Sequence, residues 1–236
     1  EAVMLKLRNR PIREPLADYS ALVTAALIAF ALPALTPWWV TAAASLFGVV
    51  VAKHLYGGLG YNLFNPAMAG YIMVLVAFPM DMSLWAAPRM ADLDYHGMTI
   101  METAQFVMTG ALPEYLSFDA ISRATPLDVV KAGLNDMQTF EELRAYPIMG
   151  DFGGRGWERI GNFTAIGGGW LLLRKIIRWQ IPFGVLAGLL VPSSLAYFLV
   201  PGINPSPEFH LFTGGTILCA FFIATDSTFN DASALL

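Results

Sequence analysis

The sequence predicts an all-α polytopic membrane protein, and its composition and hydrophobic patterning carry that prediction. Of the 236 residues, 56% are hydrophobic and 14% are charged, whereas soluble domains average about 25% charged residues. The hydrophobic residues gather in six main runs, which turns and one long polar stretch separate. This is the pattern of repeated membrane crossings. The net charge of −4, with no basic stripe, gives no support to a nucleic-acid-binding class.

The first membrane portion covers residues 1–80. Residues 1–17 are basic and are interrupted by prolines. Three membrane segments are expected in this portion, at residues 18–35, 38–52 and 67–80. A straight helix needs about 20 residues to span the hydrocarbon, so the shorter runs are expected to tilt, to borrow flanking residues or to form broken helices.

Polar and glycine-rich residues separate the second segment from the third. Lys53 and His54 come first, and a long cation at such a boundary usually extends toward water, although contact with a cofactor is also open. The loop 57–66 is too rich in glycine, asparagine and proline for ordinary helix. Unwound backbone at membrane depth must be buried in protein or line a cavity, so the loop is either a binding site or a re-entrant turn for helix packing. Its candidate binding residues are Gly57, Gly58, Gly60, Asn62 and Asn65.

Residues 81–160 form a polar excursion between two membrane portions. They hold twelve acidic and six basic residues, which gives a net charge of −6. Short helices are expected at residues 127–134 and 137–146, lying outside the bilayer. The glycine-rich turn at 153–156 matches neither phosphate-loop fingerprint.

The centre of this excursion holds the main candidate site. Residues 125–128, Thr-Pro-Leu-Asp, predict a helix start, with a Thr cap, Pro at the first helical position and an acid at the third. Ser122, Arg123 and Asp128 bring a hydroxyl, a cation and a carboxylate close to Thr125. Arginine pairs well with phosphate, and the unpaired amides of a helix N-terminus favour an anion. The local chemistry therefore suits a phosphate-linked group on Thr125, and it fits a plain helix cap equally well.

The second membrane portion covers residues 161–236. Three more segments are expected there, at residues 161–173, 181–200 and 210–225. Basic residues cluster in the N-terminal stretch, at Lys53 and just after residue 173, and short loops rich in Lys and Arg stay in the cytoplasm. If the N-terminal stretch is cytoplasmic, all three basic sites fall inside, and the excursion with Thr125 falls outside.

A short internal echo indicates an inverted repeat. Residues 54–58, His-Leu-Tyr-Gly-Gly, resemble residues 210–215, His-Leu-Phe-Thr-Gly-Gly, with one extra residue. The expected topology places the two copies at opposite faces of the membrane. This is the arrangement of inverted repeats whose interrupted helices build a site near the midplane. Chance similarity explains so short an echo equally well.

Several motifs resemble one family of membrane redox subunits. The first is Asp119-x-x-Ser122-x-Ala124-Thr125, with Arg123 where many such motifs have Gly. The other motifs lie at residues 18–21, 37–40, 52–60, 64–68, 177–179 and 220–226. In their order, and over nearly the whole chain, they resemble the D subunits of Rnf ion-translocating oxidoreductase complexes. These are related to the B subunits of sodium-pumping NADH:quinone oxidoreductases.

This resemblance implies a redox role. A flavin transferase would esterify FMN to Thr125 through its phosphate, and a second, non-covalent flavin (riboflavin) would bind within the membrane portion. Together with other subunits of the complex in a bacterial inner membrane, the chain would relay electrons and couple their passage to Na⁺ or H⁺ movement. Thr125 would lie on the periplasmic side. The resemblance also implies inverted membrane repeats and further helices beyond both ends.

Two other functions fit the same pattern of helices. A channel or carrier for a small polar solute also has short broken helices and an inverted repeat, and a membrane scaffold could simply dock redox partners. Neither function gives a reason for a transferase motif at Thr125. The sequence predicts neither a hydrolytic nor a metal site, since it has no recognisable nucleophile–His–acid triad, its three histidines match no metal-ligand spacing, and Cys219 stands alone in an apolar run.

Overall fold

A computed structural model describes residues 1–12, 17, 19–56, 64–86, 98–117, 121–122 and 124–225. Helices make up the regular structure of this part of the chain, and Met149 and Gly154 form an isolated antiparallel bridge. The predicted all-helical class is therefore confirmed for the described residues. Two compact units are present, one comprising Glu1–Ala86 with Met98–Tyr115 and the other comprising Leu116–Thr225.

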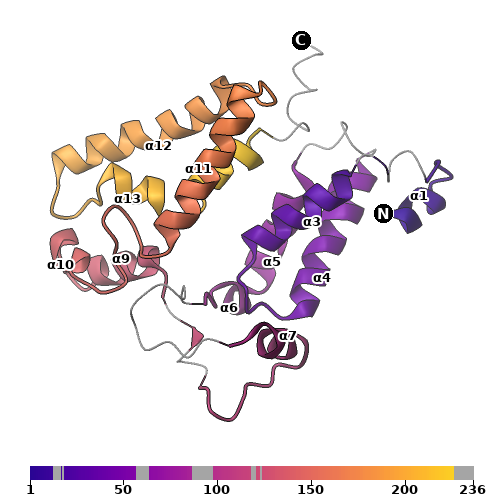
Figure 1. Cartoon of the computed structure of the whole chain (residues 1–236), viewed down its shortest axis with the longest axis horizontal. Coiled ribbons are helices and arrows are strands. Elements are labelled where there is room, and N and C mark those ends of the chain that lie inside the picture. The colour runs from indigo at the N-terminus through magenta and orange to yellow at the C-terminus, as the bar shows by residue number, and fades with distance from the viewer. Residues whose placement is uncertain are drawn as a thin grey trace. The chain divides into compact units, whose positions relative to one another are not determined.

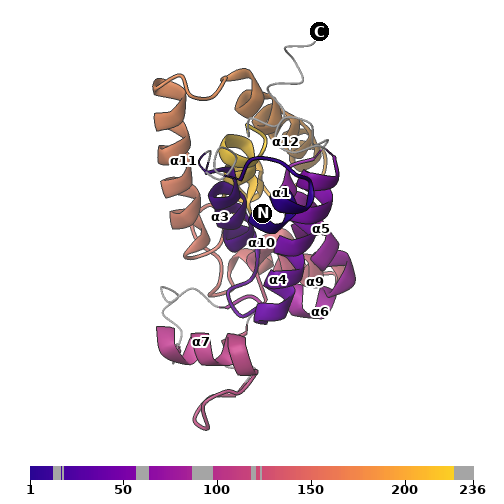
Figure 2. The same cartoon turned by 90° about the vertical axis from the view of Figure 1, so that its right-hand side faces the viewer.

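The first unit is built around three packed helices. Its helices are α1 (Ala2–Leu7), α3 (Ser20–Ala31), α4 (Trp38–Leu46), η1 (Phe47–Leu55), α5 (Pro66–Ala77), α6 (Pro79–Met82) and α7 (Ile100–Thr109). Helix α5 packs against α3, α4 and η1, as Figures 1 and 2 show. Small residues allow this close approach, because a Cβ added at Gly70 would lie 2.3 Å from the Ala44 carbonyl oxygen.

The second predicted segment is longer than expected and changes its winding. Helix α4 continues directly into η1, a π-helix, so that Trp38–Leu55 forms one span. A Cβ added at Gly48, near the start of η1, would lie 2.4 Å from the Pro66 carbonyl oxygen. The wider π turn therefore lies where the backbone of α5 comes very close. Stretches of π-helix are uncommon and often lie at functional sites.

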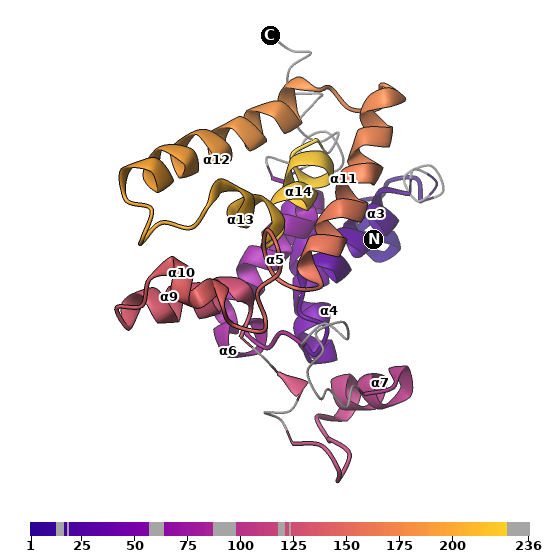
Figure 3. The same cartoon turned by 60° about the vertical axis from the view of Figure 1, so that its left-hand side comes forward.

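The second unit combines short polar helices with long apolar ones. Its helices are α9 (Pro126–Asn135), α10 (Phe140–Arg144), α11 (Trp157–Leu173), α12 (Gln180–Leu199), α13 (Pro207–Phe212), α14 (Thr216–Leu218) and η2 (Cys219–Ile223). Helix α12 packs on α13 and η2, and α11 packs on α13, α14 and η2 (Figure 3). The predicted helices at 127–134 and 137–146 are confirmed as α9 and α10, although α10 is shorter than predicted.

Two helices among the described residues are long and apolar enough to cross a membrane, namely Trp38–Leu55 and Gln180–Leu199. Only 6% of the apolar stretch of α12 is buried within the chain, so most of its hydrophobic side chains are exposed to contact lipid or another protein surface. Helices α3 and α5 are apolar but shorter. The predicted segment at 210–225 is broken at 213–215, between α13 and α14.

Two helices were missed by the sequence interpretation. Helix α7 begins with Thr99, whose side chain accepts a hydrogen bond from the Glu102 amide, and it ends at Gly110 with a positive φ of 73°. Both are ordinary start and stop signals, so α7 could have been predicted. Helix α1 has six residues and lacks a side-chain cap, so no comparable signal marks it in the sequence.

A small core holds α9 and α10 against α13. Its buried residues are Val130, Phe140, Leu143, Met149 and Phe209. The rings of Phe140 and Phe209 meet edge to face with centroids 5.4 Å apart, and the Phe140 amide donates to the Gly202 carbonyl at 2.9 Å. The polar helices are thereby fixed to an apolar one within the second unit.

Candidate functional site

Thr125 and Asp128 form a reciprocal set of hydrogen bonds at the start of α9. The Thr125 hydroxyl donates to Asp128 Oδ2 at 2.7 Å and accepts from the Asp128 amide at 3.2 Å. The same Asp128 oxygen accepts from the Thr125 amide at 3.1 Å. Thr125 is therefore the N-cap of α9, Pro126 is the first helical residue and Asp128 closes a capping box. The predicted helix start is confirmed residue by residue.

Buried neighbours hold the start of α9 in place. Pro126 is fully buried, and a Cβ added at Gly154 would lie 2.1 Å from Pro126 Cγ. Leu127 and Gly214 are both exposed, and a Cβ added at Gly214 would lie 3.3 Å from Leu127 Cδ1. Pro126 is therefore the residue that fixes the backbone next to Thr125.

A carboxylate fastens the turn that contains Gly154. Glu158 Oε1 accepts from the amides of Phe152 and Gly153 at 2.8 and 2.6 Å. Gly153 and Gly154 are buried, so the turn that contacts Pro126 is tied to the first turn of α11. Thr125 is therefore half-buried, and the residue that follows it, Pro126, packs against this turn. The carboxylate of Asp128 beside it is exposed.

The other predicted residues of this site lie at or next to the cap. Ser122 is half-buried and Ala124 is exposed. Arg123 lies outside the described residues, and its pairing with a phosphate stays a prediction. The residues present fit a phosphate ester through the positive dipole end of the ten-residue helix α9, whereas the amides of Thr125 and Asp128 are already bonded within the capping box.

Comparison with known proteins identifies the family. Residues 1–230 match the family described as NQR2, RnfD, RnfE. The chain belongs to this family. The resemblance inferred from the sequence motifs is thus confirmed.

Several curated relatives from this family are named as the D subunit of an ion-translocating oxidoreductase complex. The protein from Shewanella loihica is 45% identical over 232 residues, covering 96% of this chain and 65% of the relative. The relative from Shewanella denitrificans is 46% identical over 230 residues with the same two coverages. The relative from Aeromonas salmonicida is 42% identical over 231 residues, with coverages of 96% and 66%. The chain thus spans 65% of the length of the Shewanella relatives.

The second predicted binding site is the loop 57–66, and only residues 64–66 of it lie among the described residues. Gly57, Gly58, Gly60 and Asn62 lie outside the described residues, and their binding role stays a prediction. Asn65 is buried, and its side-chain oxygen accepts from the amides of Ala67 and Met68 at 2.9 and 3.2 Å. It therefore caps α5, and that side-chain oxygen is already engaged with the backbone.

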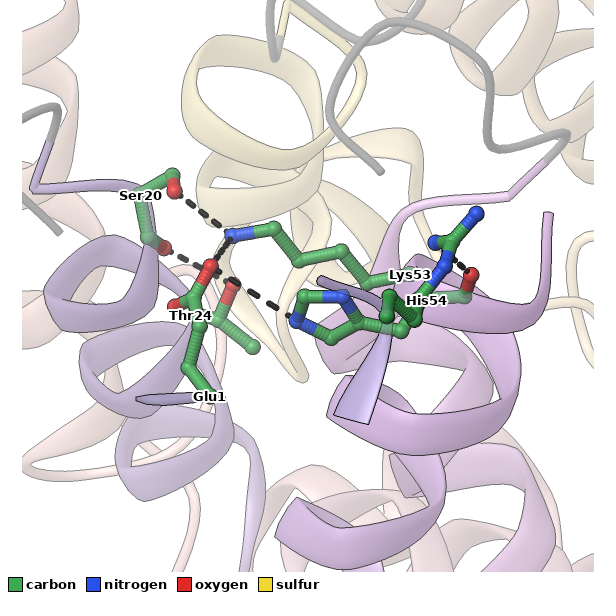
Figure 4. Close-up of polar contacts among 6 residues, drawn as sticks. Glu1, Ser20, Thr24, Lys53 and His54 are labelled. Carbon is green, nitrogen blue, oxygen red and sulfur yellow. Dashed lines mark hydrogen bonds and ion pairs between the residues drawn. The ribbon is translucent and has the colours of Figure 1, made fainter. Parts of the chain in front are cut away.

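Lys53 and His54 have a different environment from the predicted one. Lys53 Nζ lies 2.6 Å from Glu1 Oε1 and 2.7 Å from Ser20 Oγ, as Figure 4 shows. The side chains of Lys53 and Glu1 are 3% and 6% exposed, so the expectation that Lys53 extends toward water is wrong. Glu1, just before α1, and Ser20 in α3 supply polar partners inside the protein, which satisfy the ammonium group without water.

His54 shares this buried cluster. Its Nε2 lies 3.8 Å from Glu1 Oε1, which is beyond hydrogen-bond reach, and its backbone carbonyl accepts from Arg8. Sequence reasoning missed Glu1, Arg8 and Ser20 as partners, because they come from distant parts of the chain. The only available signal was the pair of adjacent ionisable residues at the end of an apolar run.

Two further capping boxes repeat the pattern of Thr125. The Thr139 hydroxyl donates to Glu142 Oε2 at 3.0 Å, and the Thr99 hydroxyl donates to Glu102 Oε2 at 2.8 Å. The donors of Thr139 lower the pKa of the exposed Glu142 carboxyl. The Tyr115 hydroxyl is the largest cause of the lowered pKa of Glu102, followed by the Thr99 donors. Cap geometry by itself therefore does not distinguish Thr125.

Proposed function

We propose that this chain is a membrane subunit of an ion-translocating oxidoreductase complex that relays electrons through FMN bound covalently to Thr125. The name shared by its relatives supports the class of complex. Two helices of spanning length support a place in the membrane. Electrons would arrive from another subunit of the complex, pass to a second, non-covalent flavin such as riboflavin, and drive the movement of Na⁺ or H⁺.

The motif Asp119-x-x-Ser122-x-Ala124-Thr125, in a member of this family, carries this proposal, and the geometry at Thr125 is compatible with it. Its hydroxyl is half-buried and hydrogen-bonded to a carboxylate, and it lies on backbone fixed by Pro126 and Gly154. FMN, when attached, supplies reversible one-electron chemistry. The chain's own part is to hold the phosphate end at the N-terminus of α9, where the helix dipole favours an anion. A covalent bond also prevents loss of the flavin from an exposed site.

The proposed inverted repeat rests on the short echo between residues 54–58 and 210–215. A π-helix lies beside each copy, because η1 (Phe47–Leu55) ends inside the first copy and η2 (Cys219–Ile223) begins after Gly215 in the second. Inverted repeats keep the same order of elements along the sequence, so these two π-helices, which lie on opposite sides of the paired glycines, do not occupy equivalent positions of the repeat. Interrupted helices of this kind form binding sites in membrane proteins.

The proposed location is a bacterial inner membrane, with the Thr125 region on the periplasmic side. Arg174, Lys175 and Arg178 follow α11 directly, and clusters of this kind stay cytoplasmic. A reporter enzyme that is active only outside the cytoplasm, fused at Leu116, is expected to be active. A cytoplasmic reporter that is active at the same position would contradict this orientation.

In-gel flavin fluorescence tests the attachment. Chains produced together with a flavin transferase are denatured and separated, so that only a covalently bound flavin remains on the band. Wild type is expected to fluoresce and Thr125→Val is expected to be dark, since valine keeps the side-chain volume and removes the nucleophilic oxygen. A dark wild-type band would overturn the proposal.

A dark band would favour the second candidate function, a channel or carrier for a small polar solute. The break at 213–215 between α13 and α14 is the observation that supports this alternative, because interrupted helices also line solute pathways. Solute uptake into vesicles that contain only this chain would then be the measurement to make.

A further inference from the structure

Asp128 accepts a hydrogen bond from the Thr125 hydroxyl, whose oxygen would form the bond to the flavin phosphate. The Thr125 hydroxyl donates to Asp128 Oδ2 at 2.7 Å, within the range of a charge-assisted hydrogen bond from a hydroxyl to a carboxylate. A hydroxyl is a weak nucleophile at its ordinary pKa and needs a base within about 2.6–3.2 Å. Asp128 meets this distance from within the chain that is modified.

We propose that Asp128 is a catalytic residue for the chain's own flavin attachment, accepting the proton of the Thr125 hydroxyl as its oxygen forms the phosphoester. This inference rests on the proposed function, and it assigns part of the catalysis to the acceptor chain. The transferase would bind the flavin donor, and the acceptor would arrive with its nucleophile already paired to a base.

The step balances with a flavin dinucleotide as donor. The bond from Thr125 Oγ1 to the flavin-side phosphorus forms, and the phosphoanhydride bond to the nucleotide breaks. The leaving nucleotide phosphate keeps the electron pair of that bond, and the Thr125 proton moves to Asp128 Oδ2. Nothing is oxidised or reduced, so the donor is the only co-reactant.

The surroundings of Asp128 suit proton transfer. Asp128 is exposed, so the carboxylic acid formed in the step can release its proton to water. Pro126 is fully buried and contacts Gly154, which holds the Thr125 backbone while its hydroxyl reacts. The capping hydrogen bonds therefore fix the distance between nucleophile and base before the donor arrives.

Substitution by asparagine separates proton transfer from helix capping. In Asp128→Asn the side-chain oxygen still accepts from the Thr125 amide, so the cap persists, but the amide group takes up no proton. Asp128→Glu restores the base, and Glu102 and Glu142 show that glutamate makes the same box with a threonine in this chain. Glu142→Gln is the matched control, because it alters a capping box that carries no proposed nucleophile.

The experiment measures the initial rate of flavin incorporation into purified full chain, using the transferase and flavin adenine dinucleotide. General bases contribute about 10²–10⁴-fold, so Asp128→Asn is expected to slow incorporation by about 10²-fold or more. Asp128→Glu is expected to recover most of the rate, and Glu142→Gln is expected to leave it unchanged. Amide hydrogen exchange of residues 127–129 checks that the asparagine variant keeps its cap.

The outcomes separate this inference from the proposed function. Incorporation into Asp128→Asn at the wild-type rate, or equal slowing of Asp128→Asn and Asp128→Glu, would overturn the role of Asp128 and leave attachment at Thr125 intact. A wild-type chain that takes up no flavin would remove the proposed function, and the role of Asp128 with it.

Discussion

The capping boxes at Thr125 and Thr139 have the same hydrogen-bond pattern in different surroundings. In both, a threonine hydroxyl donates to a carboxylate, at 2.7 and 3.0 Å, and accepts from the amide three residues later. Thr125 starts the ten-residue helix α9 on the fully buried Pro126. Thr139 is exposed and starts the five-residue α10. Both caps are followed by a fully buried residue, Pro126 in one and Phe140 in the other, so the length of the helix and the proline distinguish the two regions.

This difference has a physical meaning for modification. A phosphoester adds a bulky, negatively charged group, so its site needs backbone that keeps its position and a helix long enough to have a substantial dipole. Pro126 fixes its own φ and packs against Gly154, which limits movement of the cap. The box at Thr139 stabilises its helix start but lacks the longer helix and the proline.

The largest expected effect is the loss of covalent flavin when Thr125 is substituted, compared with the other two capping threonines. Thr125→Val is expected to eliminate covalent flavin, whereas Thr139→Val and Thr99→Val are expected to keep the wild-type flavin content per chain, measured from visible absorbance after denaturation. All three variants lose a threonine cap, and thermal unfolding of each variant is measured beside its flavin content. Loss of flavin from the Thr139 or Thr99 variant would contradict the assignment of Thr125 as the attachment site.

The support beneath Thr125 can be weakened without touching the threonine. Gly154→Ala places a Cβ where Pro126 Cγ lies only 2.1 Å away, and overpacking of this kind costs about 1–3 kcal/mol. Thermal unfolding in detergent is expected to shift downward, with slower flavin incorporation. Gly188→Ala is the control, since an added Cβ there meets nothing within 4 Å. Equal behaviour of the two variants would argue against a supporting role for this turn.

The smallest expected effect is a pH dependence at the Thr139 box. Hydrogen bonds from Thr139 lower the pKa of the Glu142 carboxyl in the folded chain below its ordinary value of 4.5. The box is therefore fully formed above that value and is lost as the pH falls through the lowered folded pKa. The rate of amide exchange at residue 142, relative to the intrinsic rate at each pH, is expected to rise over that acidic range, and Glu142→Gln is expected to remove this change in protection. An unchanged pH profile in the glutamine variant would show that another group is responsible.

Local signals made much of the polar region predictable. Thr125, Pro126 and Asp128 stand at the spacing that a helix start requires, and the structure forms that start from them. The same kind of signal at Thr99 and Glu102 was available and was overlooked. Neighbours along the chain decide such features, so a sequence contains them directly.

Long-range packing explains what the sequence could not reveal. The burial of Lys53 depends on Glu1 and Ser20, which come from other parts of the chain. The π-helix η1 lies where Gly48 meets the backbone of Pro66, and no pattern within 47–55 encodes that contact. The support of Pro126 by Gly154 is likewise visible only after folding.

The mass of the peptide that contains Thr125 tests the central claim most directly. The chain would be produced with its flavin transferase, digested and analysed by fragmentation mass spectrometry. The account predicts a mass increase equal to FMN less one water, located on Thr125, while peptides with Thr139 and Thr99 keep their unmodified masses. An unmodified Thr125 peptide, from chain made beside an active transferase, would contradict the account.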